Sequence, residues 1–333
     1  MRQSMNGGDW LRLGALSLLW GGSFLFYRML ASELPPLTTV FGRVAIGGAV
    51  LLAILAARGS PIRIPRALWG RFLVLAALNN AIPFTLFAWG ETRVTGGTAA
   101  ILNAMTPMFA VVVGALIWRQ PFTAARVAGV ACGIAGVVVL IGPGALLGQD
   151  LLGQAACLMA ALSYGFSAHY VRRIEGVTAP NMAFGQLAAS SLMLLPLMLA
   201  VDRPWTLPPP SAAGWVALLG IAIPCTAFAY LLFFDLVARA GGSNTVLVTL
   251  LVPVSALLLG AVVLGETITW TALAGMALIA AGLAAIDGRL LRLATRRGPA
   301  APRPPARGAR AGRRVGPPSA RSRWWRPSCR TDW

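Results

Sequence analysis

GGTAAILNAMTPMFAVVVGALIW, residues 96–118, and GSNTVLVTLLVPVSALLLGAVVL, residues 242–264, lie 146 positions apart and follow the same pattern. Neither stretch contains a charged residue. Each is slightly longer than the about 20 mostly apolar residues that a helix needs to cross the hydrocarbon core of a bilayer. The two stretches therefore predict a pair of membrane-spanning helices that belong to an internal repeat.

The repeat extends beyond these two helices. With a shift of 146 positions, residues 96–141 align with residues 242–287 without a gap and with eleven identities. Glycine is frequent in membrane helices, so part of this agreement follows from composition. A proline followed seven positions later by a glycine is less easily explained by composition. This spacing occurs at Pro107 and Gly114 and again at Pro253 and Gly260.

Composition places the chain in a membrane. Of its 333 residues, 57% are apolar and only 11% are charged. About a quarter are charged in an ordinary soluble domain, so a soluble enzyme is excluded. Ten apolar runs are long enough for membrane helices, and they leave little chain for a soluble domain. The runs lie near residues 10–31, 36–57, 68–89, 95–118, 124–142, 151–172, 180–201, 212–237, 243–264 and 269–287.

Each copy of the repeat holds five helices, which is an odd number. The second copy must therefore enter the membrane from the side opposite to the first. Two inverted five-helix repeats are typical of transporters with a site near the middle of the membrane. We expect an all-α membrane protein with four segments: a cytoplasmic N-terminus (1–9), a first repeat (10–142), a second repeat (151–288) and a disordered basic tail (289–333).

The arginines indicate the orientation of the chain. All 28 basic residues are arginines, and the outer segments hold only Arg28, Arg93 and Arg203 if the N-terminus is inside. Positively charged loops are retained on the cytoplasmic side of the membrane. We therefore expect both termini in the cytoplasm, and an even number of spans independently requires the termini to share a side.

Several short motifs are distinctive in combination. They are Trp20-Gly21-Gly22-Ser23-Phe24, Asn80-Ala81-Ile82-Pro83-Phe84, Asn103-Ala104-Met105-Thr106-Pro107, Asp202-Arg203-Pro204-Trp205, Ala238-Arg239-Ala240-Gly241 and Leu264-Gly265-Glu266. Over about residues 10–288 the chain resembles the EamA-type, ten-helix branch of the drug/metabolite transporter superfamily. The resemblance implies a carrier in the bacterial inner membrane that moves small metabolites, often outward, around a cavity lined by both repeats. One departure is that repeat 1 has Arg119-Gln120 where repeat 2 has Gly265-Glu266, so a matched pair of loop carboxylates is absent.

Three prolines fall inside predicted helices: Pro83, Pro107 and Pro253. A proline leaves the carbonyl four residues earlier without its usual donor, and a membrane helix tolerates this only where protein, water or ligand takes that bond. The residues at the freed carbonyls are Asn79, Asn103 and Thr249, which are all polar. We expect them to bind substrate in a wet cavity, with the prolines as hinges. The alternative is packing kinks with interhelical hydrogen bonds worth about 1 kcal/mol.

Arg43 is the strongest single candidate for substrate binding or gating. It lies seven residues into the second run, and an arginine inside a membrane helix costs about 2.5–3.5 kcal/mol on insertion scales. The alternative is that its long stem snorkels to the membrane interface. Further candidates for the cavity are amide and aromatic side chains, although Trp and Tyr near helix ends also form interfacial belts. These candidates are Trp20, Asn80, Tyr164, Gln186 and Tyr230.

Other chemistries find no support in the sequence. All ten acidic residues fall in loops, in the tail or at helix ends, so no carboxylate is expected near mid-membrane to relay protons or sodium ions. Zinc-protease and phosphate-loop motifs are missing, and histidines and carboxylates are too few for a catalytic or metal site. We expect no catalytic residue, no metal and no cofactor. The expected partners are a small-molecule solute and the lipid bilayer, and a homodimer is left open.

The tail, residues 289–333, has no apolar periodicity and holds 13 of the arginines. Such a segment cannot bury enough apolar surface to fold, so we expect it to be disordered. Arginines beside the last helix are expected to attract anionic lipid, and no specific nucleic-acid binding is expected.

The function expected from these features is a carrier that moves small organic metabolites or toxic compounds, in the direction of efflux, by alternating access. A non-transporting membrane scaffold or lipid-binding protein is the alternative class. Such a protein would share the hydropathy but would not need polar groups clustered at mid-membrane depth.

Overall fold

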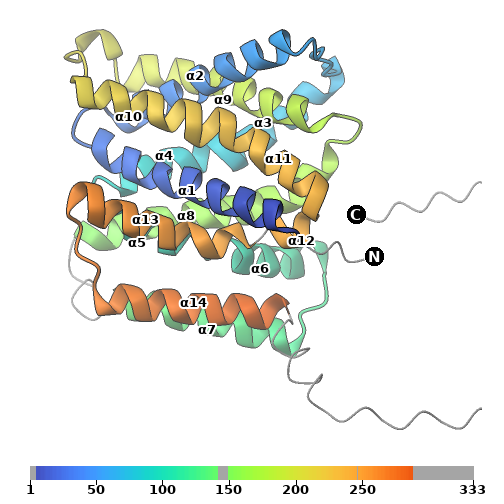
Figure 1. Ribbon diagram of the computed structural model, residues 1–333, viewed down its shortest axis with the longest axis vertical. Coiled ribbons are helices and arrows are strands. Elements are labelled where there is room, and N and C mark those ends of the chain that lie inside the picture. The colour runs from blue at the N-terminus through green and yellow to red at the C-terminus, as the bar shows by residue number, and fades with distance from the viewer. Residues whose placement is uncertain (1–4, 142–148, 246, 288–333) are drawn as a thin grey trace, which may run out of the picture.

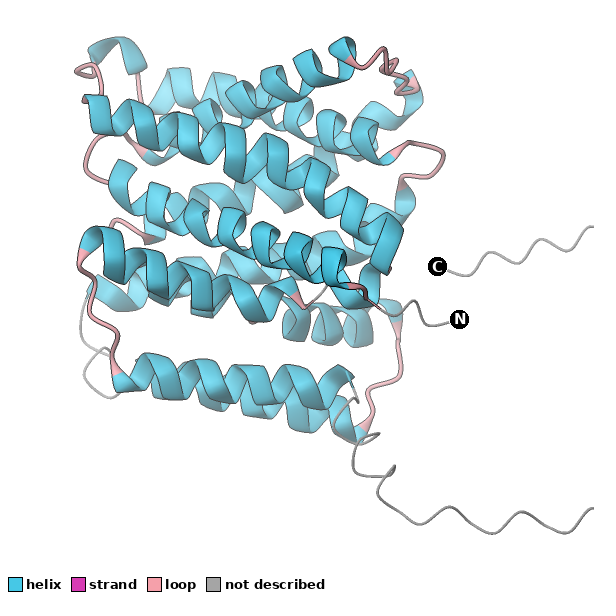
Figure 2. Cartoon of the chain, viewed as in Figure 1, coloured by secondary structure: helices cyan, strands magenta, loops and turns pink. Residues whose placement is uncertain are grey.

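The computed structural model describes residues 5–141, 149–245 and 247–287. Within these ranges the chain forms helices and loops and no strand (Figure 2). Eight helical segments are long and apolar enough to cross a membrane, and two shorter apolar helices, Val248–Leu264 and Trp270–Ile286, fall where the last two runs were expected. The all-α membrane fold expected from the sequence is confirmed. The predicted basic tail lies outside the described residues.

The helices follow the predicted runs closely (Figure 1). The first repeat consists of α1 (Gly7–Leu30), α2 (Pro36–Ala57), η1 (Arg66–Leu68), α3 (Trp69–Ala76), η2 (Ala77–Ala81), α4 (Ile82–Gly90), α5 (Gly96–Asn103), α6 (Thr106–Trp118) and α7 (Ala124–Ile141). The second repeat consists of α8 (Gln149–Tyr170), η4 (Val171–Arg173), α9 (Ala179–Val201), η5 (Pro204–Thr206), α10 (Ala212–Ala222), η6 (Ile223–Phe228), α11 (Ala229–Ala240), α12 (Gly242–Thr245), α13 (Val248–Leu264) and α14 (Trp270–Asp287).

Local sequence explains where several helices begin. At α1 the Asn6 side chain accepts a hydrogen bond from the Asp9 N–H (2.9 Å), and the Asp9 carboxylate accepts one from the Asn6 N–H (3.0 Å). This reciprocal pair is a capping box, which satisfies two backbone donors that have no partner within the helix. Ser211 caps α10 and Thr95 caps α5 through their hydroxyl oxygens, as expected for N-cap residues.

The α7 and α14 helices lie side by side at the bottom of Figure 1 and show how the repeats are related. A Cβ atom added at Gly129 would lie 2.6 Å from the carbonyl oxygen of Gly282, and one added at Gly136 would lie 2.8 Å from that of Gly275. The numbering rises along one helix while it falls along the other, so the helices are antiparallel. Gly275 and Gly282 are also the 146-position counterparts of Gly129 and Gly136. Each glycine therefore meets the counterpart of the other, which is the geometry of an inverted repeat.

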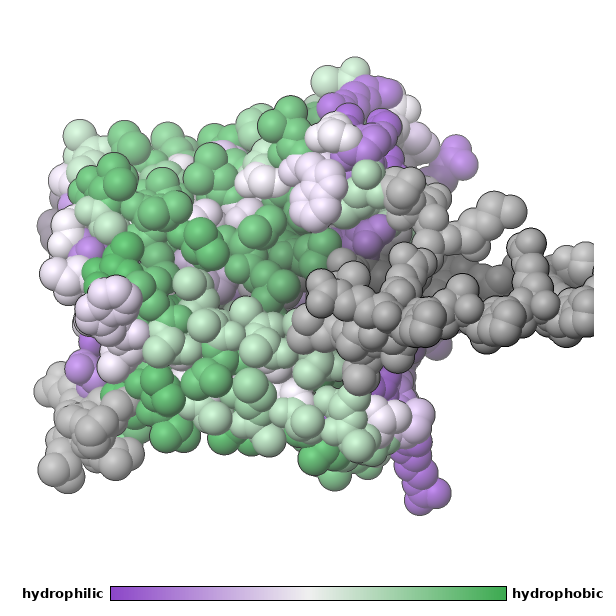
Figure 3. Space-filling model, turned by 60° about the horizontal axis from the view of Figure 1, so that its bottom comes forward, coloured by the Kyte–Doolittle hydropathy of each residue, from purple (hydrophilic) through white to green (hydrophobic). Residues whose placement is uncertain are grey.

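The α1 helix begins and α14 ends on the same side of the bundle (Figure 1). We call this side the N-terminal face and the other side the opposite face. The helices run between the two faces, and the surface in Figure 3 carries a broad hydrophobic band with hydrophilic residues concentrated toward its ends. Exposed leucines, valines and isoleucines form this band. Such a surface is suited to contact with lipid tails, and it places the faces at the two membrane boundaries.

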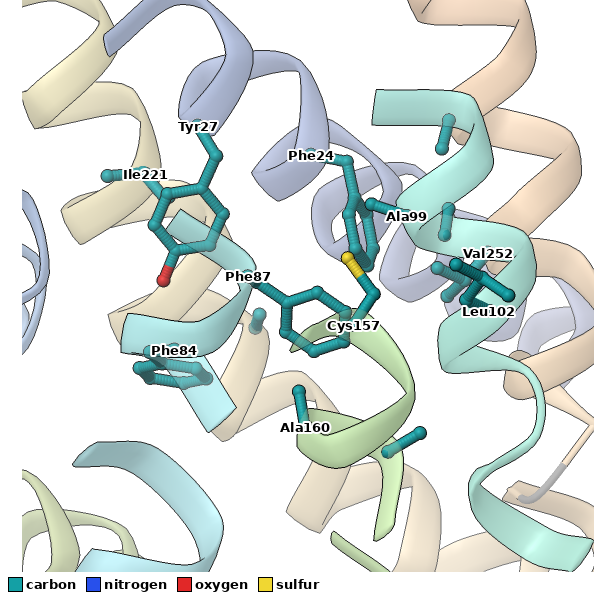
Figure 4. Close-up of a cluster of buried hydrophobic side chains, with 14 of the residues drawn as sticks. Phe24, Tyr27, Phe84, Phe87, Ala99, Leu102, Cys157, Ala160, Ile221 and Val252 are labelled. Carbon is teal, nitrogen blue, oxygen red and sulfur yellow. The ribbon is translucent and has the colours of Figure 1, made fainter. Parts of the chain in front are cut away.

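The buried core contains an aromatic cluster near the opposite face. Phe24 of α1 packs edge to face against Phe87 of α4, with 5.4 Å between the ring centroids. In Figure 4 the Tyr27 hydroxyl points toward Phe84, and Cys157 of α8 lies beside the Phe24 and Phe87 rings. These contacts join α1, α4 and α8 directly, so residues from both repeats build one core.

The glycine contact between α7 and α14 generates a prediction for stability. Gly136→Ala places a methyl group 2.8 Å from the Gly275 oxygen, and separating the backbones is expected to destabilise the protein by about 1–3 kcal/mol. Thermal unfolding of the purified protein in detergent measures the effect. Gly14→Ala is the matched control, because nothing lies within 4 Å of the Cβ at this helical position. Equal melting temperatures for the two variants would show that the glycine contact carries no packing energy.

Candidate functional site

A cavity of about 400 Å³ lies between the two repeats. Its walls come from α1, α2, α3, η2, α4, α5 and α6 of the first repeat and from α8, η4, α9, η6, α11 and α13 of the second, whereas α7 and α14 contribute no lining residue. Eight of the nine residues expected to bind substrate line it. They are Trp20, Arg43, Asn79, Asn103, Tyr164, Gln186, Tyr230 and Thr249. The structure brings these residues together, and their contact with substrate stays a prediction.

The ninth candidate, Asn80, lies behind the cavity wall. Its side chain is fully buried, donates a hydrogen bond to the Ser190 hydroxyl (3.0 Å) and accepts one from the Tyr230 hydroxyl (2.9 Å). Asn80 is therefore a support for Tyr230 and does not face the cavity. The three candidate hinge prolines also do not line it.

Asn79 joins both repeats at the cavity wall. Its side-chain amide nitrogen donates to the Gln186 carbonyl oxygen (2.8 Å), and its side-chain oxygen accepts from the Ser167 hydroxyl (2.7 Å). Gln186 is on α9 and Ser167 is on α8, so three helices meet at this amide. Polar side chains that meet in a membrane interior either bridge helices or face a wet cavity, and this cluster does both because all three residues line the cavity.

Asn79 owes its position to a π-helical segment next to Pro83. The Ile82 N–H bonds to the Ala77 carbonyl, five residues earlier. In this register the carbonyl that Pro83 leaves without a donor is that of Leu78, one residue before the Asn79 carbonyl expected from α-helical spacing. Ser163 of α8 donates to the Leu78 carbonyl (2.8 Å) and so replaces the missing donor. Single π turns inside helices are frequent at functional sites.

A second π-helical segment, η6, stands at the equivalent place in the second repeat and was not expected from the sequence. It contains Pro224, whose carbonyl accepts from the Ala229 N–H five residues later, and its Thr226 hydroxyl donates to the Ile221 carbonyl (2.8 Å). The signal was present, because Ala222-Ile223-Pro224-Cys225-Thr226 matches Ala81-Ile82-Pro83-Phe84-Thr85 at a shift of 141 positions. A search at 146 positions misses this match, since the second repeat has five more residues between Pro224 and the next helix start.

The other two candidate hinges differ from each other. The fourth span is broken at Ala104 and Met105, where α5 ends and α6 begins, and Pro107 stands in the first turn of α6. Pro107 is thus a helix-starting residue, where a missing N–H costs nothing, and not a proline inside a continuous helix as expected. Pro253 does lie inside α13. Discontinuous helices beside a binding site are common in secondary transporters.

Arg43 reaches into the bundle and not toward the membrane surface. Its side chain is 5% exposed, its Nη1 donates to the Tyr27 hydroxyl (2.8 Å) and its Nε donates to the Thr226 hydroxyl (2.9 Å). The guanidinium carbon lies 3.7 Å from the centroid of the Phe84 ring. The snorkelling alternative is therefore incompatible with this structure, and Arg43 occupies one wall of the cavity.

The described residues contain no group of three or more His, Cys, Asp or Glu side chains that could hold a metal ion. The sole histidine of the sequence, His169, stacks on Trp118 with 4.7 Å between ring centroids and contacts the Ala110 carbonyl (2.7 Å). A histidine in these contacts has a packing role near the N-terminal face.

The model of the EamA-like transporter family matches residues 10–142 and 151–286, which correspond to the two repeats. The chain belongs to the EamA-like transporter family. This EamA-like protein is 30% identical to the uncharacterized inner membrane transporter YedA of Escherichia coli K12 over 273 residues, covering 78% of this chain and 85% of YedA. It is 32% identical over 250 residues to a probable terminal-alkyne amino-acid exporter of Streptantibioticus cattleyicolor, covering 73% of this chain and 81% of the relative.

Two further comparisons agree with the fold. The EamA-like protein is 26% identical to the uncharacterized transporter YvbV of Bacillus subtilis 168 over 283 residues, covering 83% of this chain and 90% of YvbV. A solved crystal structure superposes with a TM-score of 0.62 at 22% sequence identity, covering 86% of this chain and 99% of that one. At this identity the likeness shows the fold alone. Family membership and the apolar helices identify the chain as a membrane transporter.

Glu91 of the EamA-like protein is a carboxyl group that sequence analysis placed at a helix end without foreseeing its burial. Its side chain has 0% exposure, and neither side-chain oxygen has a hydrogen-bond partner among the described residues. Arg28 donates to the main-chain oxygen of Glu91 (2.8 Å) and not to its carboxylate. Burial, and then repulsion from Glu266, raise the pKa of Glu91, against the opposing effects of Arg28 and Arg43.

This raised pKa generates a prediction for pH dependence. Because the ordinary pKa of glutamate is about 4.3, the stability of this conformation is fully present below about pH 4.3 and is lost as pH rises toward the raised pKa. We expect the melting temperature in detergent to fall as pH rises above the ordinary glutamate pKa of about 4.3, and Glu91→Gln to flatten the fall. Exposed Glu175→Gln is the control. An equally steep fall in the Glu91→Gln protein would assign the pH dependence to other groups.

Proposed function

We propose that this EamA-like protein carries small organic solutes out of the cell by alternating access of its two inverted repeats around the central cavity. The observation that supports this most strongly is the composition of the cavity wall. Amide, hydroxyl and aromatic side chains from both repeats converge there, at the junction that must rearrange when one repeat moves against the other. A scaffold or lipid-binding protein has no need for such a cluster.

Hydrogen bonds between the repeats on each face support the alternating-access mechanism. On the opposite face the Asp202 carboxylate accepts two hydrogen bonds from Thr38, from its N–H (2.7 Å) and from its hydroxyl (2.8 Å). On the N-terminal face Arg12 and Asp235 form an ion pair (3.1 Å) whose side chains are 35% and 40% exposed. The Arg12–Asp235 pair is weak enough to break and re-form during a transport cycle, because exposed ion pairs contribute at most about 1 kcal/mol.

The distribution of arginines supports the proposed orientation of the chain in the membrane, and a relative supports the proposed direction of transport. Arginines are concentrated in the segments of the N-terminal face, which is expected on the cytoplasmic side. The name of the Streptantibioticus relative includes export of an amino acid, which supports small organic solutes and outward movement. Attraction of residues 289–333 to anionic lipid and a homodimer are further proposals that need separate measurement.

The test of this function starts with a growth screen. Cells that overproduce the protein are compared with cells that carry an empty vector for tolerance of metabolites and toxic compounds. Compounds that pass the screen are then loaded into liposomes with the purified protein, and saturable flux is expected. A complete absence of flux for every compound that gave tolerance would contradict the carrier function.

Asn103→Leu then tests the role of the cavity in transport. The variant removes an amide that lines the cavity and accepts a long hydrogen bond from the Thr106 hydroxyl (3.4 Å). We expect flux of the screened compound to fall about fivefold to tenfold, because a lost polar contact is worth about 1–1.4 kcal/mol. The melting temperature of the variant serves as the folding control. Unchanged flux in a folded variant would rule out direct involvement of Asn103.

A further inference from the structure

Arg43 brings a full positive charge into a cavity whose described lining residues include no acidic side chain. The ion pairs among the described residues are Arg12 with Asp235 and Arg239 with Asp235, and Arg43 takes part in neither. Its hydrogen-bond partners, Tyr27 and Thr226, are neutral. Glu91 lies within electrostatic range of Arg43 but forms no salt bridge with it and does not line the cavity. Arg43 is thus a buried cation without a directly paired carboxylate, which is costly because a charge removed from water normally needs an opposite charge.

The guanidinium group also has donors to spare. Arginine carries five N–H donors in a planar fork, and the hydrogen bonds of Arg43 use its Nε and Nη1. No described residue accepts a hydrogen bond from Nη2, and Arg43 lines the cavity. Tyr27, Thr226 and the Phe84 ring hold the group from different sides, so its orientation is fixed before any ligand arrives. A preorganised fork of this kind suits a carboxylate.

The other lining residues of the cavity limit the charge that a bound ligand can carry and the chemical nature of the rest of the ligand. Arg43 is the single charged side chain among the described lining residues, so it balances one negative charge and not the two of a phosphate monoester. Aromatic rings of Trp20, Phe24, Phe87 and Tyr164 also line the cavity. An apolar or aromatic body is stabilised by such walls. A cationic group would meet no carboxylate in the lining.

We propose that the cavity binds organic monocarboxylates with an apolar or aromatic body, and that Arg43 pairs with the carboxylate through its free fork. This inference rests on the proposed transport function for the identity of the cavity as the substrate site. It goes further because it selects singly charged anions over neutral and cationic solutes of the same shape.

The experiment compares three probes on the purified full chain in chloride-free detergent buffer: 3-phenylpropionate, its neutral amide 3-phenylpropanamide and the cation 3-phenylpropylamine. Binding is followed by tryptophan fluorescence, because Trp20 lines the cavity. We expect the carboxylate to bind about tenfold or more tightly than the amide, since hydrogen bonds between ionised partners are about twice as strong as neutral ones, and the amine to bind most weakly. Equal binding of carboxylate and amide by the unmodified protein overturns the proposal without any variant.

Variants then assign the selectivity to Arg43. Arg43→Gln is expected to reduce the carboxylate-to-amide ratio to about one, and Arg43→Lys to retain part of it, because lysine keeps the charge but loses the fork. Exposed Arg58→Gln removes one charge outside the cavity and is expected to keep the full ratio. A purely structural role of Arg43 would weaken both probes equally and leave the ratio unchanged, which would refute the proposal.

These outcomes are separable from failure of the transport function. Binding is measured without a membrane gradient, so selective carboxylate binding without flux in liposomes would contradict transport and keep the Arg43 site. Flux of neutral compounds with no preference for the carboxylate would keep transport and remove the site.

Discussion

The structure depends on one constraint: within hydrocarbon, each backbone N–H and carbonyl must find a partner inside the protein. A straight α-helix meets this constraint automatically, and a helix with a proline does not. In this protein the third and eighth spans each combine a proline with a π-helical segment, with Pro83 just after η2 and Pro224 inside η6. Ser163 supplies the donor for the Leu78 carbonyl in the first, and in the second the Thr226 hydroxyl donates to the Ile221 carbonyl, three residues before Pro224. These two segments carry polar side chains into the interior of the bundle, where a carrier needs them.

The two repeats share this backbone arrangement but have diverged in their side chains. The first π-helical segment presents Asn79 to the cavity, where the amide joins α8 and α9. The second presents Cys225 to the cavity, while its Thr226 accepts a hydrogen bond from Arg43. The cavity is therefore asymmetric although its walls come from equivalent elements. Its lining includes both a cation, Arg43, and the amide side chains of Asn79 and Gln186, so a bound solute meets chemically different groups.

Hydropathy and repeat spacing predicted much of the fold, because the bilayer imposes a minimum helix length that is legible in the sequence. The site was predictable in part, because a polar side chain such as Asn103 within an apolar run is costly against lipid and is therefore expected in the interior of the bundle. What the sequence did not indicate depends on packing between distant segments. The burial of Glu91 requires α1 and the loop after α13 to cover it, and the break at Ala104 depends on the neighbours of that span. Pro224 was not recognised as the counterpart of Pro83, because the two repeats differ in length between this proline and the next helix.

The glycine contact of α7 with α14 has an evolutionary consequence. Gly129 lies against Gly282, and Gly136 lies against Gly275, so the contact is unchanged when the two halves exchange places. A single five-helix polypeptide inserted into the bilayer in both directions would make the same contact with an upside-down copy of itself. Gene duplication and fusion of such an ancestor would preserve the pairing without any new complementary surface, and would then free each half to specialise.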